Sequence, residues 1–371
     1  MLKVAQRRSR RKEDSMCNKM WLILIATLVL VLSLLPACRA EAPIPTPTPM
    51  PTPTPTRTCP EITLKFATWL PIGHPNAVIG YEYWANLVTE RTNGAVKFEW
   101  YPSMQLIKGP EMLAGVGSGV ADLGVVVPAY EAGRVPLRTF HSLPFAFETP
   151  EQVIEVYNSA DDILAPELDE FNVISMYGTP AQFTILYTTD TPVMTVEDLK
   201  GLRIRTAGGL QEGIFLAADA VPQTMSSTEV YTSMQRGMLD GVASLPTSVE
   251  AHDWSEFVKY MIFTNHSMVT GSTIMNMDTW NSLSPECQQL MIDAGRDMQQ
   301  YALSTLDEQT QEAIESSKAF GMDVSNMSEA ERTKWKELTV PLWDEWLAAA
   351  EEAGKGDAAR KLLQIVEDVT G

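Results

Sequence analysis

Residues 198–246 read DLKGLRIRTAGGLQEGIFLAADAVPQTMSSTEVYTSMQRGMLDGVASLP and predict the fold class of the chain. Within this stretch, residues 202–206 alternate apolar and polar side chains as a half-buried β-strand does, with Arg205 on the polar side. A loop with two glycines at residues 207–209 follows, and residues 211–220 then read as a helix. A strand, a loop and a helix in this order form the first part of an α/β unit.

The rest of this stretch predicts another helix and another strand. Ser226 and Glu229 have the spacing of a capping box, in which each side chain accepts a hydrogen bond from the other residue's backbone N–H. Gly237 is expected to end this helix, because glycine adopts the left-handed conformation without steric cost. Residues 238–243 then read as a short strand. Strands that alternate with helices favour an α/β fold with a parallel sheet.

Arg205 stands where a strand end, a glycine loop and a helix N-terminus meet. Backbone N–H groups and the helix dipole favour an anion at such a place. A guanidinium can also hold a carboxylate through two parallel hydrogen bonds. A solvent-exposed arginine at the end of a strand would have the same local sequence, so the spacing alone leaves both interpretations open.

Two motifs in this region resemble the substrate-binding proteins of TRAP transporters, the tripartite carriers for carboxylates. DLKGLRIR at residues 198–205 and TEVYTSMQRGMLDG at residues 228–241 stand in the order and at the separation typical of that family. The resemblance extends over residues 62–346, nearly all of the globular part. It implies that Arg205 binds the carboxylate of the ligand.

The resemblance also implies a periplasmic-binding-protein-like fold of type II. In such a fold two α/β lobes enclose a ligand cleft, and a long helix and crossover strands link them. We expect residues 60–182 to form lobe I, with about 271–310 returning to it. Residues 183–270 are expected to form lobe II, with about 311–371 returning to it, and the charged C-terminal helices are expected to form a solvated outer surface.

An internal repeat supports two lobes that are built alike. In both 111–124 and 231–241 a helix ends at a glycine, two residues and an aspartate follow, and a short apolar strand begins. The two aspartates are Asp122 and Asp240. We expect each to accept hydrogen bonds from backbone N–H groups in its own turn.

Further side chains are expected around Arg205. Trp69 follows a strand at residues 62–68, and ligands of α/β sheets bind beyond the carboxyl ends of the strands. A core tryptophan would show the same pattern, so both roles remain open for it. The resemblance places Gln182 near a second polar contact to the ligand. The complete predicted ligand-binding set is Arg205, Gln182, Trp69, Ser244, Tyr130 and Thr247.

Two departures from the family pattern bear on the ligand. Family members often carry asparagine near Ser244, in a D-G-x-E-N segment, and Val-Pro where Thr206 and Ala207 stand here. We therefore expect a pocket that binds a carboxylate but is otherwise more apolar. Such a pocket favours a monocarboxylate, a 2-oxo acid or an aromatic acid over a C4-dicarboxylate.

Residues 1–38 predict an export signal. Basic residues precede an apolar run at 20–36, and the Leu-Pro-Ala-Cys sequence at 35–38 resembles the lipidation site of a bacterial lipoprotein. Lipidation of Cys38 would anchor the protein to the membrane on its extracytoplasmic side, in the periplasm or at the cell surface. The run is also near the length of a membrane span, so an uncleaved anchor is the alternative. Residues 39–59, rich in proline and threonine, predict a semi-rigid spacer.

Composition excludes several classes of function. The 371 residues carry a net charge of −19, which argues against nucleic acid as a partner. The chain shows no G-x-S-x-G, H-E-x-x-H or S-x-x-K motif in a suitable context and no Cys/His pair with ligand spacing. We therefore expect no enzyme, no metal and no cofactor. Cys59 and Cys287 can form a disulfide in an oxidising compartment, but their spacing does not decide it.

These observations predict an extracytoplasmic solute-binding protein. It would capture a small organic acid by hinge closure and deliver it to the membrane permease subunits of a TRAP-type transporter. One alternative is a ligand-sensing receptor domain for a signalling partner, and another is an extracytoplasmic enzyme that acts on an acidic substrate. An ATP-driven transporter fits less well, because the two motifs resemble the TRAP class.

Overall fold

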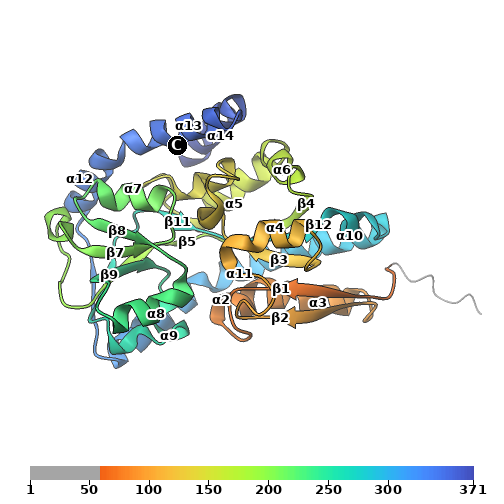
Figure 1. Ribbon diagram of the computed structural model, residues 1–371, viewed down its shortest axis with the longest axis horizontal. Helices are drawn as coiled ribbons and strands as arrows, with labels where there is room; N and C mark the ends of the chain where they lie inside the picture. Colours follow the sequence, from red (N-terminus) through yellow and green to blue (C-terminus); the bar gives the residue numbers. More distant parts are fainter. Residues whose placement is uncertain (1–58) are drawn as a thin grey trace, which may run out of the picture. The chain divides into compact units, whose positions relative to one another are not determined.

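A computed structural model describes residues 59–371 of the chain. Cys38 and the predicted export signal lie outside the described residues, as does the spacer except for its last residue. None of the helices in this described part combines the length and the apolar character that crossing a membrane requires. Two β-sheets with helices packed around them make up the described part (Figure 1).

The first sheet has five strands in the order β2-β1-β3-β12-β4. Their bounds are β1 Ile62–Ala67, β2 Val96–Tyr101, β3 Leu123–Val126, β4 Val173–Gly178 and β12 Ser272–Asn276. Strand β1 runs parallel to β2 and β3, whereas β12 runs antiparallel to β3 and β4. Strands β1, β2 and β3 are thus parallel as predicted, and the sheet as a whole is mixed because β12 runs in the opposite direction. The antiparallel strand is the one that enters from the other sheet.

The second sheet has six strands in the order β13-β10-β6-β9-β7-β8. Their bounds are β6 Ile185–Thr188, β7 Arg203–Thr206, β8 Val221–Thr224, β9 Gly241–Ser244, β10 Tyr260–Phe263 and β13 Asp323–Asn326. Strand β7 is parallel to β8 and β9, and β6 is antiparallel to β9 and β10. Again the antiparallel strand, β6, arrives from the other sheet. We call each sheet with its helices the first half and the second half; the lobe boundaries predicted above stay predictions.

The helices and single turns of the first half connect its strands. They are α2 Pro75–Ala77, η1 Val78–Glu82, α3 Tyr83–Arg91, η2 Gly109–Glu111, α4 Met112–Gly117, η3 Pro128–Glu131, η4 Leu137–Ser142, α5 Pro150–Ser159, α6 Asp161–Asp169 and α10 Met277–Asn281. Those near the second sheet are η5 Val196–Leu199, α7 Leu210–Leu216, α8 Ser227–Gln235, α9 Ser248–Ala251, η6 Trp254–Glu256 and α12 Glu329–Thr339. The chain ends with α13 Pro341–Glu352 and α14 Gly356–Thr370.

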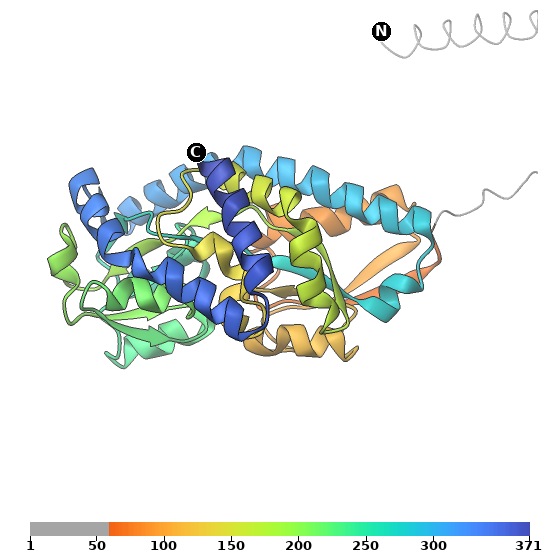
Figure 2. The same cartoon turned by 90° about the horizontal axis from the view of Figure 1, so that it is seen from above.

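Two strand connections, one long helix and the C-terminal helices link the halves. Between β4 and β6 lies β5 (Gln182–Phe183), and between β10 and β12 lies β11 (Met268–Val269). These two short strands pair antiparallel to each other and form a ribbon between the sheets. The long helix α11 (Pro285–Ala319) packs on α3 and β4 of the first half and on α9 and β13 of the second. Figure 2 shows α11 extending along both halves.

The central stretch folds as its local sequence predicted. The capping box of Ser226 and Glu229 is present at the start of α8, and Gly237 follows this helix with a φ of 65°. A second capping box, made by Thr195 and Asp198, starts η5. Each box satisfies backbone N–H groups at a helix start that would otherwise lack partners.

The repeated aspartates have the same role in both halves, but it is not the role that we expected. Asp122 Oδ2 accepts a hydrogen bond of 2.8 Å from the backbone N–H of Lys65 in β1. Asp240 Oδ2 accepts one of 2.8 Å from the backbone N–H of Arg203 in β7. Each aspartate therefore fixes the neighbouring parallel strand rather than its own turn.

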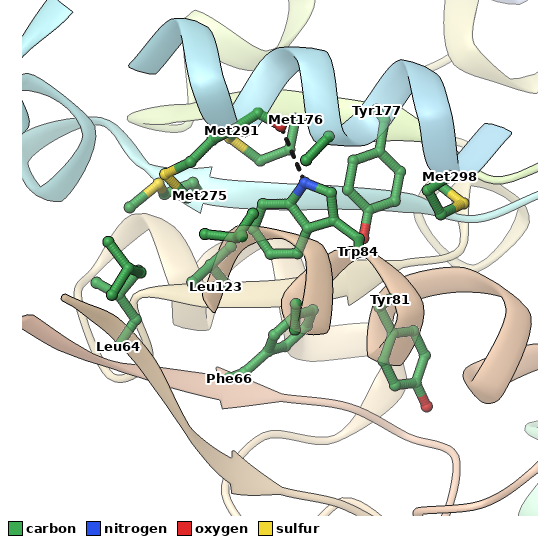
Figure 3. Close-up of a cluster of buried hydrophobic side chains, with 14 of the residues drawn as sticks. Leu64, Phe66, Tyr81, Trp84, Leu123, Met176, Tyr177, Met275, Met291 and Met298 are labelled. Atoms are coloured by element: carbon green, nitrogen blue, oxygen red, sulfur yellow. Dashed lines mark hydrogen bonds between the residues drawn. The ribbon is translucent and has the colours of Figure 1, made fainter. Parts of the chain in front are cut away.

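Aromatic side chains fill the core between the first sheet and α11. Trp84 of α3 is fully buried with Phe66 and Tyr177 around it, and its Nε1 donates to the carbonyl of Met291 at 3.0 Å (Figure 3). This bond ties α11 to the first half. At the other end of the chain, α14 packs against α5, and Leu362 is fully buried. The C-terminal helices are thus solvated on one face only, unlike the outer surface that we expected.

A disulfide joins Cys59 to Cys287 at the start of α11, with the two Cα atoms 5.0 Å apart. It closes a loop with a sequence separation of 228 residues, which restricts the unfolded chain strongly. We expect the double substitution Cys59→Ser with Cys287→Ser to lower the free energy of unfolding by about 2–5 kcal/mol. Urea unfolding followed by circular dichroism measures this change.

The control for the disulfide is the unsubstituted protein in reducing agent. Its unfolding midpoint should move to that of the double variant, while the reducing agent should not move the variant further. Equal midpoints for the variant and the oxidised parent would contradict a stabilising role for this bond.

Two buried histidines predict a loss of stability in mild acid. Burial lowers the pKa of His141 to about 4 and that of His266 to about 3, from 6.5. Between pH 6.5 and 4 these two histidines therefore bind protons in the unfolded chain but not in the folded chain. The free energy of unfolding should fall as the pH falls through this window, by about 1.4 kcal/mol per histidine and pH unit. Urea unfolding at pH 7.5 and 5 measures it.

Burial raises the pKa of Glu131 and of Glu167, and these carboxyls act in the opposite sense. His266→Gln isolates the histidine contribution, because its unfolding free energy should change less between the two pH values than that of the parent. The same pH dependence in both proteins would show that His266 does not resist protonation in the fold.

Candidate ligand-binding site

A cavity lies between the two sheets and is lined from both halves. Trp69 stands just after β1 and Val127 just after β3, while Arg205 lies near the end of β7 and Ser244 is the last residue of β9. The carboxyl ends of parallel strands from both sheets therefore open into one space. This is where α/β sheets place their ligands.

Five of the six predicted ligand-binding residues line this cavity. They are Trp69, Tyr130, Gln182, Arg205 and Ser244. Thr247 is not among the lining residues; it is buried at the N-cap of α9, where its hydroxyl lacks a hydrogen-bond partner. The neighbouring Ser248 lines the cavity in its place. The structure thus gives the positions of these side chains, and their binding roles stay predictions.

Arg205 is buried and only 3% exposed. Its Nε donates to the carbonyl of Met225 at 2.9 Å and its Nη1 to the carbonyl of Ala243 at 3.2 Å. Its Nη2 donates to the hydroxyl of Tyr130 at 3.3 Å. A guanidinium carries five N–H groups, so two remain for another acceptor. All three acceptors are neutral, and the ion pairs within residues 59–371 do not include Arg205.

Arg203, two residues earlier on the same strand, has the opposite character. Its Nη2 lies 2.6 Å from Oδ1 of Asp240, and 43% of its side chain is exposed. The hydrogen bonds from Arg203 hold the pKa of Asp240 below its usual value. The interpretation as a solvated strand-end arginine therefore fits Arg203 and fails for Arg205.

Tyr130 connects the two halves across the cavity. It lies in η3, just after β3 of the first sheet, and its hydroxyl accepts hydrogen bonds from second-half donors. The donors are Nη2 of Arg205, at 3.3 Å, and the backbone N–H of Ser227, at 3.4 Å. These contacts join the two halves across the cavity.

The cavity also brings together two histidines that the sequence left unconnected. His74, the N-cap of α2, and His252, just after α9, have ring centroids 5.8 Å apart. Burial lowers the pKa of both to about 4; the charge of Arg205 lowers that of His252 further, and repulsion from a protonated His252 lowers that of His74 further. Both rings are neutral near pH 7. No motif joins two residues so far apart in the chain, so nothing in the sequence pointed to this pair.

Several further polar residues of the cavity were also missed, and most of them satisfy one another. Gln182 Nε2 donates to Asn76 Oδ1 at 3.2 Å, and Gln211 Nε2 donates to the hydroxyl of Thr184 at 3.1 Å. The hydroxyls of Ser244 and Ser248 lie 2.7 Å apart. By contrast, three lining atoms lack a hydrogen-bond partner within the described residues: Trp69 Nε1, His74 Nε2 and Ser227 Oγ.

Residues 67–349 match the profile of bacterial extracellular solute-binding protein, family 7. Among curated proteins, the C4-dicarboxylate-binding periplasmic protein of Rhodobacter capsulatus is 26% identical over 290 residues, which span 76% of this chain and 86% of the relative.

Solved structures of similar fold include two receptors with named ligands. One is a TRAP periplasmic solute binding protein from Desulfovibrio salexigens with bound orotic acid, at a TM-score of 0.76 and 23% identity, covering 83% of this chain and 98% of that one. Another is an extracytoplasmic solute receptor from Bordetella pertussis that binds pyroglutamic acid. Its TM-score is 0.73 and its sequence identity 23%, and the match covers 81% of this chain and 99% of that one. The likeness confirms the expected type II periplasmic-binding fold.

The Tyr130 bridge makes a testable prediction about the unliganded protein. Tyr130→Phe keeps the ring but removes the acceptor for Arg205 and Ser227, so the closed arrangement should lose about 1 kcal/mol, or about fivefold in population. Small-angle X-ray scattering without ligand should give a larger radius of gyration for the variant.

Tyr231→Phe is the matched control, because its hydroxyl bonds only Glu256 on the surface, at 3.3–3.4 Å. This control should scatter like the parent. If Tyr130→Phe also scatters like the parent, the bridge does not hold the halves together.

Proposed function

Since the chain belongs to family 7 of the bacterial extracellular solute-binding proteins, we propose that it is the receptor of a TRAP-type transporter and binds a small organic acid. The named ligands of its relatives and structural neighbours support this class: a C4-dicarboxylate, orotic acid and pyroglutamic acid are all carboxylic acids. The protein would act outside the cytoplasm, held to the membrane by a lipid on Cys38.

The observation that carries the proposal is the buried guanidinium of Arg205. Removing a cation from water is costly unless an opposite charge compensates it. The carbonyls of Met225 and Ala243 compensate in part and orient the group, and two N–H bonds remain for a ligand. A carboxylate supplies both the missing charge and the matching pair of acceptors.

Capture by closure follows from how the halves are joined. Only the β5–β11 ribbon, α11 and the C-terminal helices span them in the described part, and the cavity lies between the two sets of strand ends. A ligand held by Arg205 on one side and by first-half residues on the other would favour the closed form. That form would then be presented to the membrane permease subunits.

The site offers no support for an enzyme, and the family match favours transport over a signalling receptor, whose site would look the same. Arg205 is the only residue with a formal charge among those that line the cavity. General acid–base catalysis would need a positioned acid or base of suitable pKa, and both lining histidines have a pKa of only about 4. A binding role accounts for the site without further assumptions.

The test of this function is calorimetric titration with a panel of mono-, di-, 2-oxo and sugar acids. We expect micromolar or tighter binding of at least one acid by the parent protein. Arg205→Ala should weaken that binding by 100-fold or more, because loss of one partner of a buried ion pair costs about 3–5 kcal/mol. Arg205→Lys should lie between the two, since it keeps the charge but not the paired donors.

Arg203→Ala is the matched control, because it removes an arginine of the same strand that is already paired with Asp240. Its affinity should equal that of the parent. An acid that binds Arg205→Ala as tightly as the parent would rule out the proposed site, and a panel without any binder would rule out the proposed ligand class.

A further inference from the structure

We propose that the ligand is a monocarboxylate with an apolar body and an uncharged hydrogen-bond acceptor at its far end. The ring N–H groups of Trp69 and His74 would donate to this acceptor. This inference rests on the proposed function, because it takes Arg205 as the site of the single carboxylate. It adds a second set of ligand contacts, made by the first half of the molecule, and it predicts which acids the site selects.

The charge of the cavity limits the ligand to one carboxylate. Among the residues that line it, Arg205 alone carries a formal charge near pH 7. A second carboxylate would be buried without a counter-charge, which is unfavourable. The two histidines do not supply one, since burial keeps both rings neutral.

The hydrogen bonds of His74 determine which of its nitrogens carries the proton. Its Nδ1 lies 3.1 Å from the backbone nitrogen of Asn76 and accepts that N–H as the N-cap of α2. A neutral imidazole has one donor and one acceptor nitrogen. The proton must therefore be on Nε2, and this N–H has no partner among the described residues although it is buried. His74 thus offers one unused donor.

Trp69 adds a second unused donor on the same half. An indole N–H can only donate, and Trp69 Nε1 is buried without an acceptor in the described part of the chain. The amides of Gln182 and Asn76 bond each other, and the Gln211 amide donates to the Thr184 hydroxyl and accepts the backbone N–H of Ala207. Since buried polar groups are almost always hydrogen-bonded, the two orphaned donors of the first half call for an acceptor from the ligand; the third orphan, the Ser227 hydroxyl, belongs to the second half.

Much of the cavity wall is apolar. Its side chains come from both sheets and from the ribbon, and they include Leu70, Ile79, Val125, Val127, Ala243 and Val269. A hydrocarbon or aromatic body gains by contact with such a wall, whereas a chain of hydroxyl groups would leave its donors unpaired there. The ligand is therefore polar at its two ends and apolar between them.

The experiment compares three classes of acid at equal chain length by calorimetry. The probes are methyl-ketone acids from 4-oxopentanoate to 7-oxooctanoate, the alkanoates without the ketone, and the dicarboxylates with a second carboxylate in its place. At the best chain length, the oxo acid should bind at least tenfold more tightly than the alkanoate. It should bind about 100-fold more tightly than the dicarboxylate, whose second charge has no partner.

Two substitutions test whether Trp69 and His74 bind the acceptor at the far end of the ligand. Trp69→Phe keeps the aromatic body and removes the N–H; His74→Ser removes the ring N–H but keeps a side chain that can cap α2. Each should weaken binding of the oxo acid about tenfold more than it weakens binding of the alkanoate. Trp343→Phe is the control: its indole donates to the carbonyl of Pro144 at 3.4 Å, away from the cavity, and it should bind all acids as the parent does.

The outcomes separate this inference from the function on which it rests. If no acid of any class binds, the proposed function fails. If acids bind and Arg205→Ala abolishes binding, the receptor function stands. The inference is then overturned if the dicarboxylate binds as tightly as the oxo acid, or if Trp69→Phe and His74→Ser change both monocarboxylates equally.

Discussion

The site depends on one buried positive charge that has no carboxylate partner within the described residues. Two backbone carbonyls and one hydroxyl hold the Arg205 guanidinium in place, and they do so with partial charges only. Such an arrangement orients the donors but compensates only part of the desolvation cost of the cation. An anion that enters the cavity therefore gains more than it would from the same arginine on the surface. In the proposed function, affinity for the ligand and stability of the closed form come from the same interaction.

The surrounding fold preserves this arrangement, because it keeps the other charged side chain of β7 and its partner away from Arg205. Arg203 is paired with Asp240, and the same aspartate also accepts the backbone N–H that aligns β7 with β9. Asp122 aligns β1 with β3 in the same way. Two similarly built halves then present the carboxyl ends of their parallel strands to one cavity. The repeat in the sequence is thus the reason that ligand groups can be bound from both sides.

Hydrogen bonds and a disulfide hold the links between the halves in place. The Thr179 hydroxyl accepts the backbone N–H of Gly271 at 2.9 Å, and the Thr270 hydroxyl donates to the Thr179 carbonyl, so the ribbon is held where the chain crosses. Helix α11 is fixed to the first half by the Trp84 hydrogen bond and by the disulfide at its start. Its other end packs on the second half. In the proposed closing motion, only the few connections between the halves would bend, and both cores would stay intact.

The sequence by itself determined what depends on near neighbours. Capping boxes such as Ser226 with Glu229, the alternation that defines β7, and the motif that marks Arg205 involve residues a few positions apart, so their local geometry follows from local sequence. Tertiary structure alone decided that Arg205 is buried while Arg203 is solvated, that His74 meets His252, and that α14 has a buried face. It also decided that each sheet receives an antiparallel strand from the other half. These features join residues far apart in the chain, and only the packing of the two halves brings such residues into contact.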